Sequence, residues 1–382
     1  MNCIQTNSNN VNSVVINRLI KFFLLLLFAV FLFLMIDKKN LPMFITFLYV
    51  AVILFYPMRY DFGKLLALIY VWLLVFLVYR KVIDFNFIPQ AKDLLDMNPN
   101  IFYWLSIGHA HAVRLLVAYP GYIMSIVFGV TLNEGFSYYC IFMYLLMYLN
   151  ILDSSRNIKV FKGHILYKLK DVLCLFPMII LTFLMNGRLV AAFFGFSILV
   201  DLFCKVFNDI KVNMVSVIIV ISFGFLFTTV SSGTMMVSFI YIVAMIYFRN
   251  KNNLNKKRFG FTFAIMLILF MPIIIEIFQY IYFMFMRNVN YFGGGIEGFI
   301  NMMQHGVGRY FINNPFIFLF FIIAAMFIIL FNIRFIRRQE IKNYNFLPVI
   351  IAVNISIYGL LFGHSTGLMA VVPLIIIMLK YI

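Results

Sequence analysis

The sequence predicts an all-α, polytopic integral membrane protein with about 11–13 transmembrane helices. Of its 382 residues, 64% are hydrophobic and only 11% are charged, which is far more apolar than the composition of soluble domains. Most of the apolar segments are long enough to cross the roughly 30 Å hydrocarbon core of a bilayer. They do not alternate apolar and polar residues, as the strands of a transmembrane barrel do. We therefore expect one membrane domain over 1–382.

The apolar segments can be placed in order along the chain. The Asn-rich start, 1–18, predicts a disordered tail. The first segment, 19–36, ends in "DKKN" without a small-x-small cleavage site, so we interpret it as a retained helix and not a signal peptide. The later segments fall near 41–58, 64–79, 112–131, 136–152, 172–185, 189–204, 212–229, 235–248, 259–283, 316–333, 346–362 and 368–380.

Basic residues orient the second half of the chain. The net charge is +17, and 17 lysines and arginines gather in alternate loops and at the C-terminus, whereas the loops between them hold three arginines and no lysine. By the positive-inside rule the basic loops are cytoplasmic. Turns 186–188, 230–234 and 363–367 and a large loop, 284–314, then lie on the periplasmic face. The charge therefore indicates topology, and we expect no nucleic-acid partner.

The first half of the chain leaves two alternatives open. If 80–111 is a single cytoplasmic loop, the N-terminus lies outside the membrane. If this stretch hides another crossing, the N-terminus lies inside. We favour the second alternative, with an irregular segment at "NPNIFYWLSIGHAHAV" (98–113).

Cysteines and histidines give no metal or disulfide pattern. The cysteines are Cys3, Cys140, Cys174 and Cys204; no two are close in sequence and three lie in apolar segments, so they predict small buried residues. His109 and His111 are two residues apart and do not share a helical face. We expect no metal and no cofactor.

The short periplasmic turns combine glycine with hydroxyl or amide residues. Such turns leave N–H groups free at helix ends, where an anion can bind, although the same residues are also ordinary turn formers. Arginine binds phosphate through two parallel hydrogen bonds, which lysine cannot do. Arg188 therefore predicts a phosphate site, the alternative being that it extends to lipid headgroups. The full set of predicted phosphate-binding residues is Arg188, Arg287, Arg309, Ser232, Thr234 and His364.

The periplasmic loop 284–314 predicts a surface helix. A triple glycine precedes an apolar stripe over 296–310, and a polar stripe carries Glu297, His305 and Arg309. We interpret 296–311 as a lid with a catalytic acid or base, Glu297 or His305; the alternative is an ordinary amphipathic helix. Glu276 is a third catalytic candidate because carboxylates are rare inside membranes; the alternative is that it only pairs with an arginine such as Arg287.

Two segments resemble a known family. "LFPMIILTFLMNGRLVAAFFG", "TTVSSGTMMVSF" and the large loop late in the chain resemble the Wzy-type O-antigen and capsular polysaccharide polymerases of bacteria, over about 170–382. "GHSTG" (363–367) is similar to the histidine motif of O-antigen ligases, but the match is too short to transfer a role.

The resemblance implies a metal-independent glycosyltransferase in the bacterial inner membrane, acting in lipopolysaccharide or capsule synthesis. It would join oligosaccharide repeats linked to undecaprenyl pyrophosphate on the periplasmic face, with a chain-length regulator and a flippase as partners. Such a reaction needs cations for the leaving pyrophosphate and a base for the acceptor hydroxyl.

Two other functions stay open. A lipid-linked oligosaccharide flippase would have two similar halves and charged residues along a central path, and the sequence indicates neither. A membrane acyltransferase that modifies the polysaccharide would need a histidine-based catalytic unit, for which "HAHAVR" (109–114) is the one candidate.

Overall fold

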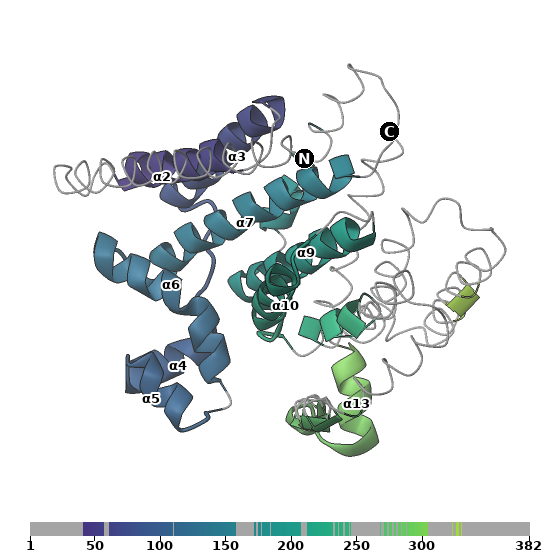
Figure 1. The fold of residues 1–382 in the computed structure, drawn as a ribbon. Coiled ribbons are helices and arrows are strands. Elements are labelled where there is room, and N and C mark those ends of the chain that lie inside the picture. Colours follow the sequence, from purple (N-terminus) through teal and green to yellow (C-terminus); the bar gives the residue numbers. More distant parts are fainter. Residues whose placement is uncertain are drawn as a thin grey trace, which may run out of the picture.

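The computed structural model describes residues 41–56, 61–109, 111–157, 185–207, 212–231 and 289–304, with scattered residues in 172–183, 234–245, 268–287 and 323–330. Within these ranges the regular elements are α-helices and no strand is present, so the predicted all-α class is confirmed there (Figure 1). The helices are α2 (Leu41–Phe55), α3 (Asp61–Tyr79), α4 (Pro89–Met97), α5 (Ile101–Ser106), α6 (Ala112–Phe128), α7 (Leu132–Asn157), α9 (Gly187–Phe207), α10 (Met214–Thr228) and α13 (Gly295–Gln304).

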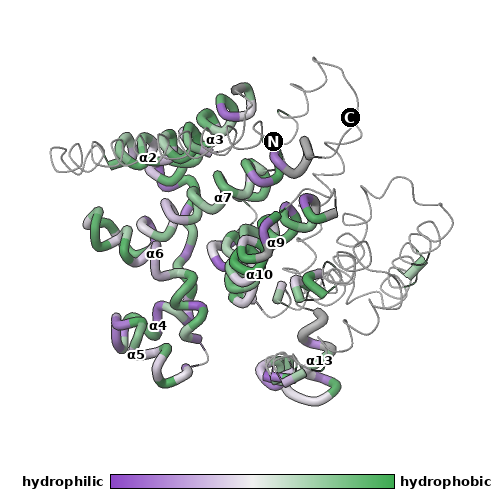
Figure 2. The backbone as a smooth tube through the Cα atoms, in the orientation of Figure 1, coloured by the Kyte–Doolittle hydropathy of each residue, from purple (hydrophilic) through white to green (hydrophobic). Residues whose placement is uncertain are grey.

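Two of the described helices are long and apolar enough to cross a membrane. They are Phe62–Tyr79 in α3 and Leu132–Asp153 in α7, and α2, α6 and α10 are shorter apolar helices. Figure 2 shows the largely hydrophobic character of α2 and α3. The exposed large side chains of α3 recur every three or four residues and form an apolar stripe suited to lipid: Leu65, Ile69, Trp72, Phe76 and Tyr79. These features support a membrane protein. Most of the other predicted crossings lie partly or wholly outside the described residues.

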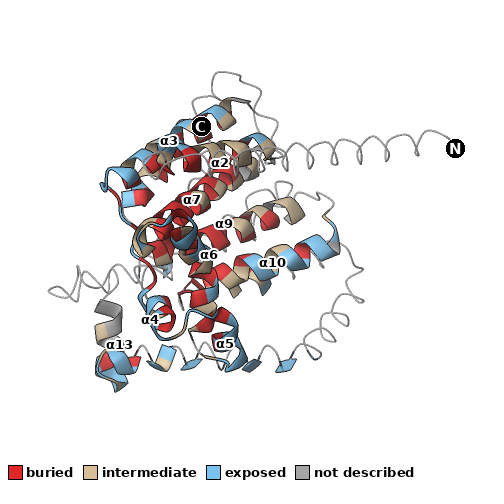
Figure 3. Ribbon diagram, turned by 90° about the vertical axis from the view of Figure 1, so that its left-hand side faces the viewer, coloured by how far each residue is buried: buried red, intermediate tan, exposed pale blue. Residues whose placement is uncertain are grey.

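Helix α7 is the centre of the described bundle. Most of its side chains are buried (Figure 3), and it packs against α3, α6 and α9. The aromatic rings of Tyr70 and Tyr148 lie 5.7 Å apart between α3 and α7. Helix α2 runs in the same direction as α7, because Tyr49 donates to the carbonyl of Tyr138 at 2.6 Å and Tyr56 donates to Asn150 farther along both helices at 2.8 Å.

Helices α7 and α9 also run in the same direction. Gly187, at the start of α9, packs on Phe136 near the start of α7. At their far ends, Lys205 of α9 lies 3.0 Å from Asp153 of α7. We call the end of the bundle that holds the N-termini of α7 and α9 the Arg188 end, and the opposite end the Lys205 end.

The segment 80–131 begins and returns at the Arg188 end. Directly after α3, the backbone N–H of Phe85 donates to Ser137 (2.9 Å), and that of Phe87 donates to Asn133 (3.1 Å) in the first turns of α7. The segment therefore makes no net crossing. The favoured alternative places one hidden crossing in 80–111 before the crossing at 112–131. Two crossings also return the chain to the side on which it began, so the structure agrees with this alternative.

Helices α9 and α10 form a close antiparallel pair. A Cβ on Gly224 would lie 3.0 Å from Leu199 and 3.1 Å from the carbonyl oxygen of Gly195. Glycine at the crossing lets the two backbones approach, as is common in membrane helix pairs. Because the pair is antiparallel, the turn that follows Thr228 lies at the Arg188 end.

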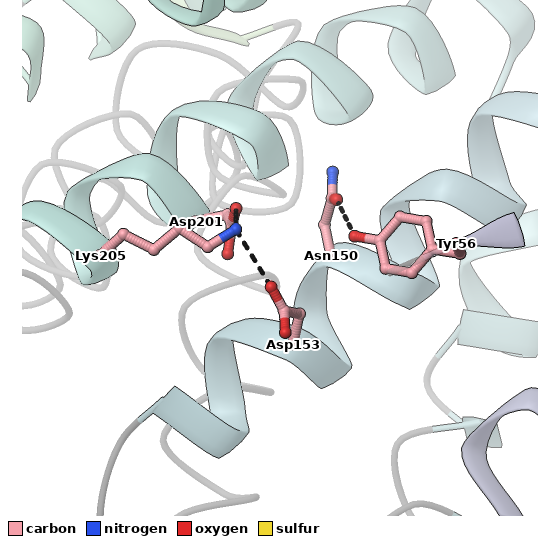
Figure 4. A network of polar contacts seen from close by, with 5 residues as sticks. All are labelled: Tyr56, Asn150, Asp153, Asp201 and Lys205. Carbon is pink, nitrogen blue, oxygen red and sulfur yellow. Dashed lines mark hydrogen bonds and ion pairs between the residues drawn. The ribbon is translucent and has the colours of Figure 1, made fainter. Parts of the chain in front are cut away.

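A polar network joins α7 and α9 at the Lys205 end (Figure 4). Lys205 donates to Asp201, one turn earlier in α9, at 2.7 Å, and forms an ion pair with Asp153 across the helix interface at 3.0 Å. The side chain of Asp201 is only 13% exposed. Two carboxylates therefore share one ammonium group.

Candidate anion-binding site

Arg188 lies in the first turn of α9, and its neighbours fix that turn. The side-chain oxygen of Asn186 accepts a hydrogen bond from the N–H of Leu189 at 3.1 Å, which caps the helix. Gly187 is buried, and a Cβ there would overlap the ring of Phe136 and lie 3.0 Å from the carbonyl oxygen of Asn86. The "NGR" turn is therefore set by a cap and by a close contact that needs glycine.

The side chain of Arg188 is half-buried, and part of its hydrogen-bonding capacity is unused. Its Nε is buried and has no hydrogen-bond partner, and no ion pair to Arg188 is present among the described residues. A buried donor without a partner is unfavourable by about 1–3 kcal/mol. The helix N-terminus adds partial positive charge beside it. An anion would satisfy both groups.

The turn after α10 uses its hydroxyl groups internally. Thr234 is fully buried, and its Oγ lies 2.7 Å from the carbonyl oxygen of Thr228 and 2.8 Å from that of Ser231. A hydroxyl group has one proton, so Thr234 has no donor left for a phosphate in this structure. Ser232 lies outside the described residues.

A second polar cluster, which contains two arginines, is built from distant parts of the chain. Nη2 of Arg287 lies 3.2 Å from Nε2 of His111, across 176 residues of sequence. Nδ1 of His111 is buried without a hydrogen-bond partner. Burial, then the charges of Arg114 and Arg287, lower the pKa of His111 to about 4, against a smaller opposing effect of Asp93. His111 is therefore neutral at pH 7 and can accept the Arg287 hydrogen bond.

This contact joins two parts of the chain that are far apart in sequence. Arg287 belongs to the predicted loop 284–314, and His111 belongs to the segment 80–111, for which the sequence left two topologies open. No cluster that could bind a metal is found in the part of the chain that the structure describes. No local pattern in the sequence indicates the pairing of Arg287 with His111.

The remaining predicted site residues are placed as follows. Glu297 is exposed in the first turn of α13, and Gly293, Gly294 and Gly295 before it have positive φ values of 119°, 77° and 57°. This helix covers the first part of the predicted 296–311. Glu276 is exposed and helical, and no described contact joins either glutamate to Arg188. His305, Arg309 and His364 lie outside the described residues.

Comparisons of the chain with protein-family models, with curated proteins and with solved structures find no match. The interpretation of the site therefore depends on its residues and their geometry.

Proposed function

We propose that the protein is a metal-independent membrane glycosyltransferase that polymerises lipid-linked oligosaccharides. Its substrates would be repeat units on undecaprenyl pyrophosphate, and its product O-antigen or capsular polysaccharide, made at the periplasmic face of the inner membrane. The observation that carries the proposal is Arg188, a half-buried arginine with an unpartnered Nε at a helix N-terminus.

Arg188 would act on the leaving group. In the proposed reaction a sugar hydroxyl of one repeat attacks the anomeric carbon of the growing chain. The bond between that carbon and the pyrophosphate oxygen breaks, and the lipid pyrophosphate leaves with the electron pair. Charge-assisted hydrogen bonds from a guanidinium stabilise the developing negative charge. The hydroxyl proton passes to a base, for which Glu297, His305 and Glu276 are the candidates.

Purified protein should elongate lipid-linked repeats in the presence of EDTA. We expect Arg188→Ala to abolish elongation and Arg188→Lys to restore little, because an ammonium group lacks the paired donors of a guanidinium. Arg80→Ala is the matched control: this arginine is exposed just after α3 and stacks on the ring of Phe76, with 5.5 Å to its centroid. Full activity of the lysine variant would show that the site is not a bidentate phosphate site.

The flippase is the second candidate, and the network of Lys205, Asp153 and Asp201 favours it. Charged groups shared between helices of a membrane protein are typical of transport pathways. In a deletion strain, a polymerase defect leaves single repeats accessible at the periplasmic face. A flippase defect leaves them on the cytoplasmic side, and an acyltransferase defect gives chains of normal length without acetyl groups. Asp201→Asn should leave elongation by folded protein intact if the polymerase proposal is right.

A further inference from the structure

Helix α5 has an unusual distribution of apolar side chains. Ile101 and Trp104 are buried, and the indole N–H of Trp104 donates to the carbonyl of Asn98 at 2.7 Å. Asn100 caps the helix by accepting from the N–H of Phe102 at 3.0 Å. These contacts hold Trp104 inward. The remaining apolar side chains of α5, and that of Ile107 just after it, are exposed on the outer side. Those exposed are Phe102 (76%), Tyr103 (45%), Leu105 (39%) and Ile107 (53%), which we call the α5 tip.

Two histidine rings and two arginines lie beside the α5 tip. The ring of Trp104 is 5.3 Å from that of His109, which is 5.7 Å from the ring of His111. His111 in turn contacts Arg287 at 3.2 Å, and Arg114 is close enough to influence its charge state. An apolar aromatic tip next to arginines is the arrangement found where proteins meet the bilayer interface, with rings among the upper acyl chains and cations near the phosphates.

The neighbouring helix α4 has the opposite character on its outer side. Its buried residues are Ala91, Leu94 and Leu95, whereas Lys92, Asp93 and Asp96 are exposed. Both helices pack against α6. Helix α4 exposes these charged groups together with Met97, whereas α5 exposes rings and aliphatic groups. The loop that leads into α4 contacts the first turns of α7 and α9 through Phe85, Phe87 and Asn86, so α4 begins at the Arg188 end, and Figure 1 shows α4 and α5 at the edge of the described helices.

We propose that the α5 tip is an interfacial anchor that inserts into the bilayer at the Arg188 end, and that Arg287, held by His111, binds the phosphate of a phospholipid headgroup beside it. The partner is the phospholipid bilayer itself. The proposal stands independently of the polymerase activity, because it needs no lipid-linked sugar.

Tryptophan fluorescence tests the insertion directly, because the chain has only two tryptophans, Trp72 and Trp104. Trp72→Phe protein and the Trp72→Phe/Phe102→Trp double variant are reconstituted in bilayers of brominated phospholipid. We expect the fluorescence added by the second substitution to be quenched by bromine near the top of the acyl chain and shielded from iodide. Wild-type Trp72, exposed within α3, is the deep control. Insertion is overturned if iodide quenches the fluorescence of the added indole, or if no brominated phospholipid quenches it.

Native mass spectrometry tests the headgroup contact. Protein reconstituted with phospholipid alone, free of undecaprenyl lipids, should keep a bound phospholipid of matching mass when released from detergent. Arg287→Gln should lower the retained fraction several-fold. Arg80→Gln is the control, because Arg80 is also exposed and lies where the segment 80–131 begins at the Arg188 end; this variant should retain phospholipid like the wild type. Equal retention in wild type and Arg287→Gln overturns the headgroup site. Inorganic phosphate that displaces the phospholipid at millimolar concentration would show a free-anion site and also overturns it.

Discussion

Replacing Gly187 with alanine should move the first turn of α9 without removing any functional group. The added Cβ would overlap the ring of Phe136, which is fully buried and packs against Phe87 with 4.9 Å between ring centroids. The carbonyl of Asn86, 3.0 Å away, blocks the other direction. Overpacking of a closed site by one methyl group costs about 1–3 kcal/mol. Because Arg188 follows directly, we expect elongation to fall at least tenfold in protein that still folds.

A double-mutant cycle measures whether this ring is the obstacle. Thermal unfolding in detergent is compared for wild type, Gly187→Ala, Phe136→Leu and the double variant. Leucine removes the ring edge, so the two changes should compensate, with a coupling of about 1 kcal/mol or more. Gly187→Ala protein with wild-type stability and activity, or strictly additive effects in the cycle, would refute the reasoning.

Three further outcomes are expected. Lys205→Met removes the ammonium group that Asp153 and Asp201 share, and should destabilise the protein by about 1–3 kcal/mol, less than the loss of a fully buried pair because the groups are partly exposed. Neutralising both carboxylates as well should restore most of the loss, and no restoration would contradict the ion-pair account. Stability should decline as the pH falls from about 6.5 towards 4, because the lowered pKa of His111 means that the unfolded state binds the proton over that window and the folded state does not. The His111–Arg287 contact itself should be lost only as His111 protonates in the folded protein, near pH 4. Thermal unfolding measures the first effect and hydrogen exchange near Arg287 the second; a stability that does not fall between pH 7 and 4 would disprove the account. Thr234→Val should cost about 1 kcal/mol in thermal stability through the lost internal hydrogen bond, with elongation per folded molecule unchanged; a selective loss of elongation would instead show that the hydroxyl binds substrate.

Local patterns predicted the class of the protein and the position of one turn. Apolar composition and helical runs depend on near neighbours in sequence, so the all-α class is confirmed among the described residues. The turn predicted at 186–188 lies at the start of α9, and the structure adds that Asn186 caps this helix. The sequence also predicted Arg188 as a phosphate ligand, and the structure adds that its Nε lacks a partner.

Contacts between distant segments could not be predicted. His111 and Arg287 are 176 positions apart, and nothing in either local sequence indicates the other. The same applies to Asp153 and Lys205, which meet only because α7 and α9 run in the same direction. The hydroxyl of Thr234 was expected to face a substrate, but a threonine near a turn can equally donate to a preceding carbonyl, and only coordinates distinguish the two.

The two attachments between α7 and α9 also determine where the protein can move. Phe136 contacts Gly187 at one end, and Asp153 binds Lys205 at the other. A slide of one helix past the other would break both contacts at once, so this pair should behave as a fixed frame in the proposed reaction. Rearrangement on substrate entry is then left to elements outside the frame, foremost α13, whose entrance at Gly293–Gly295 has the backbone freedom to act as a hinge.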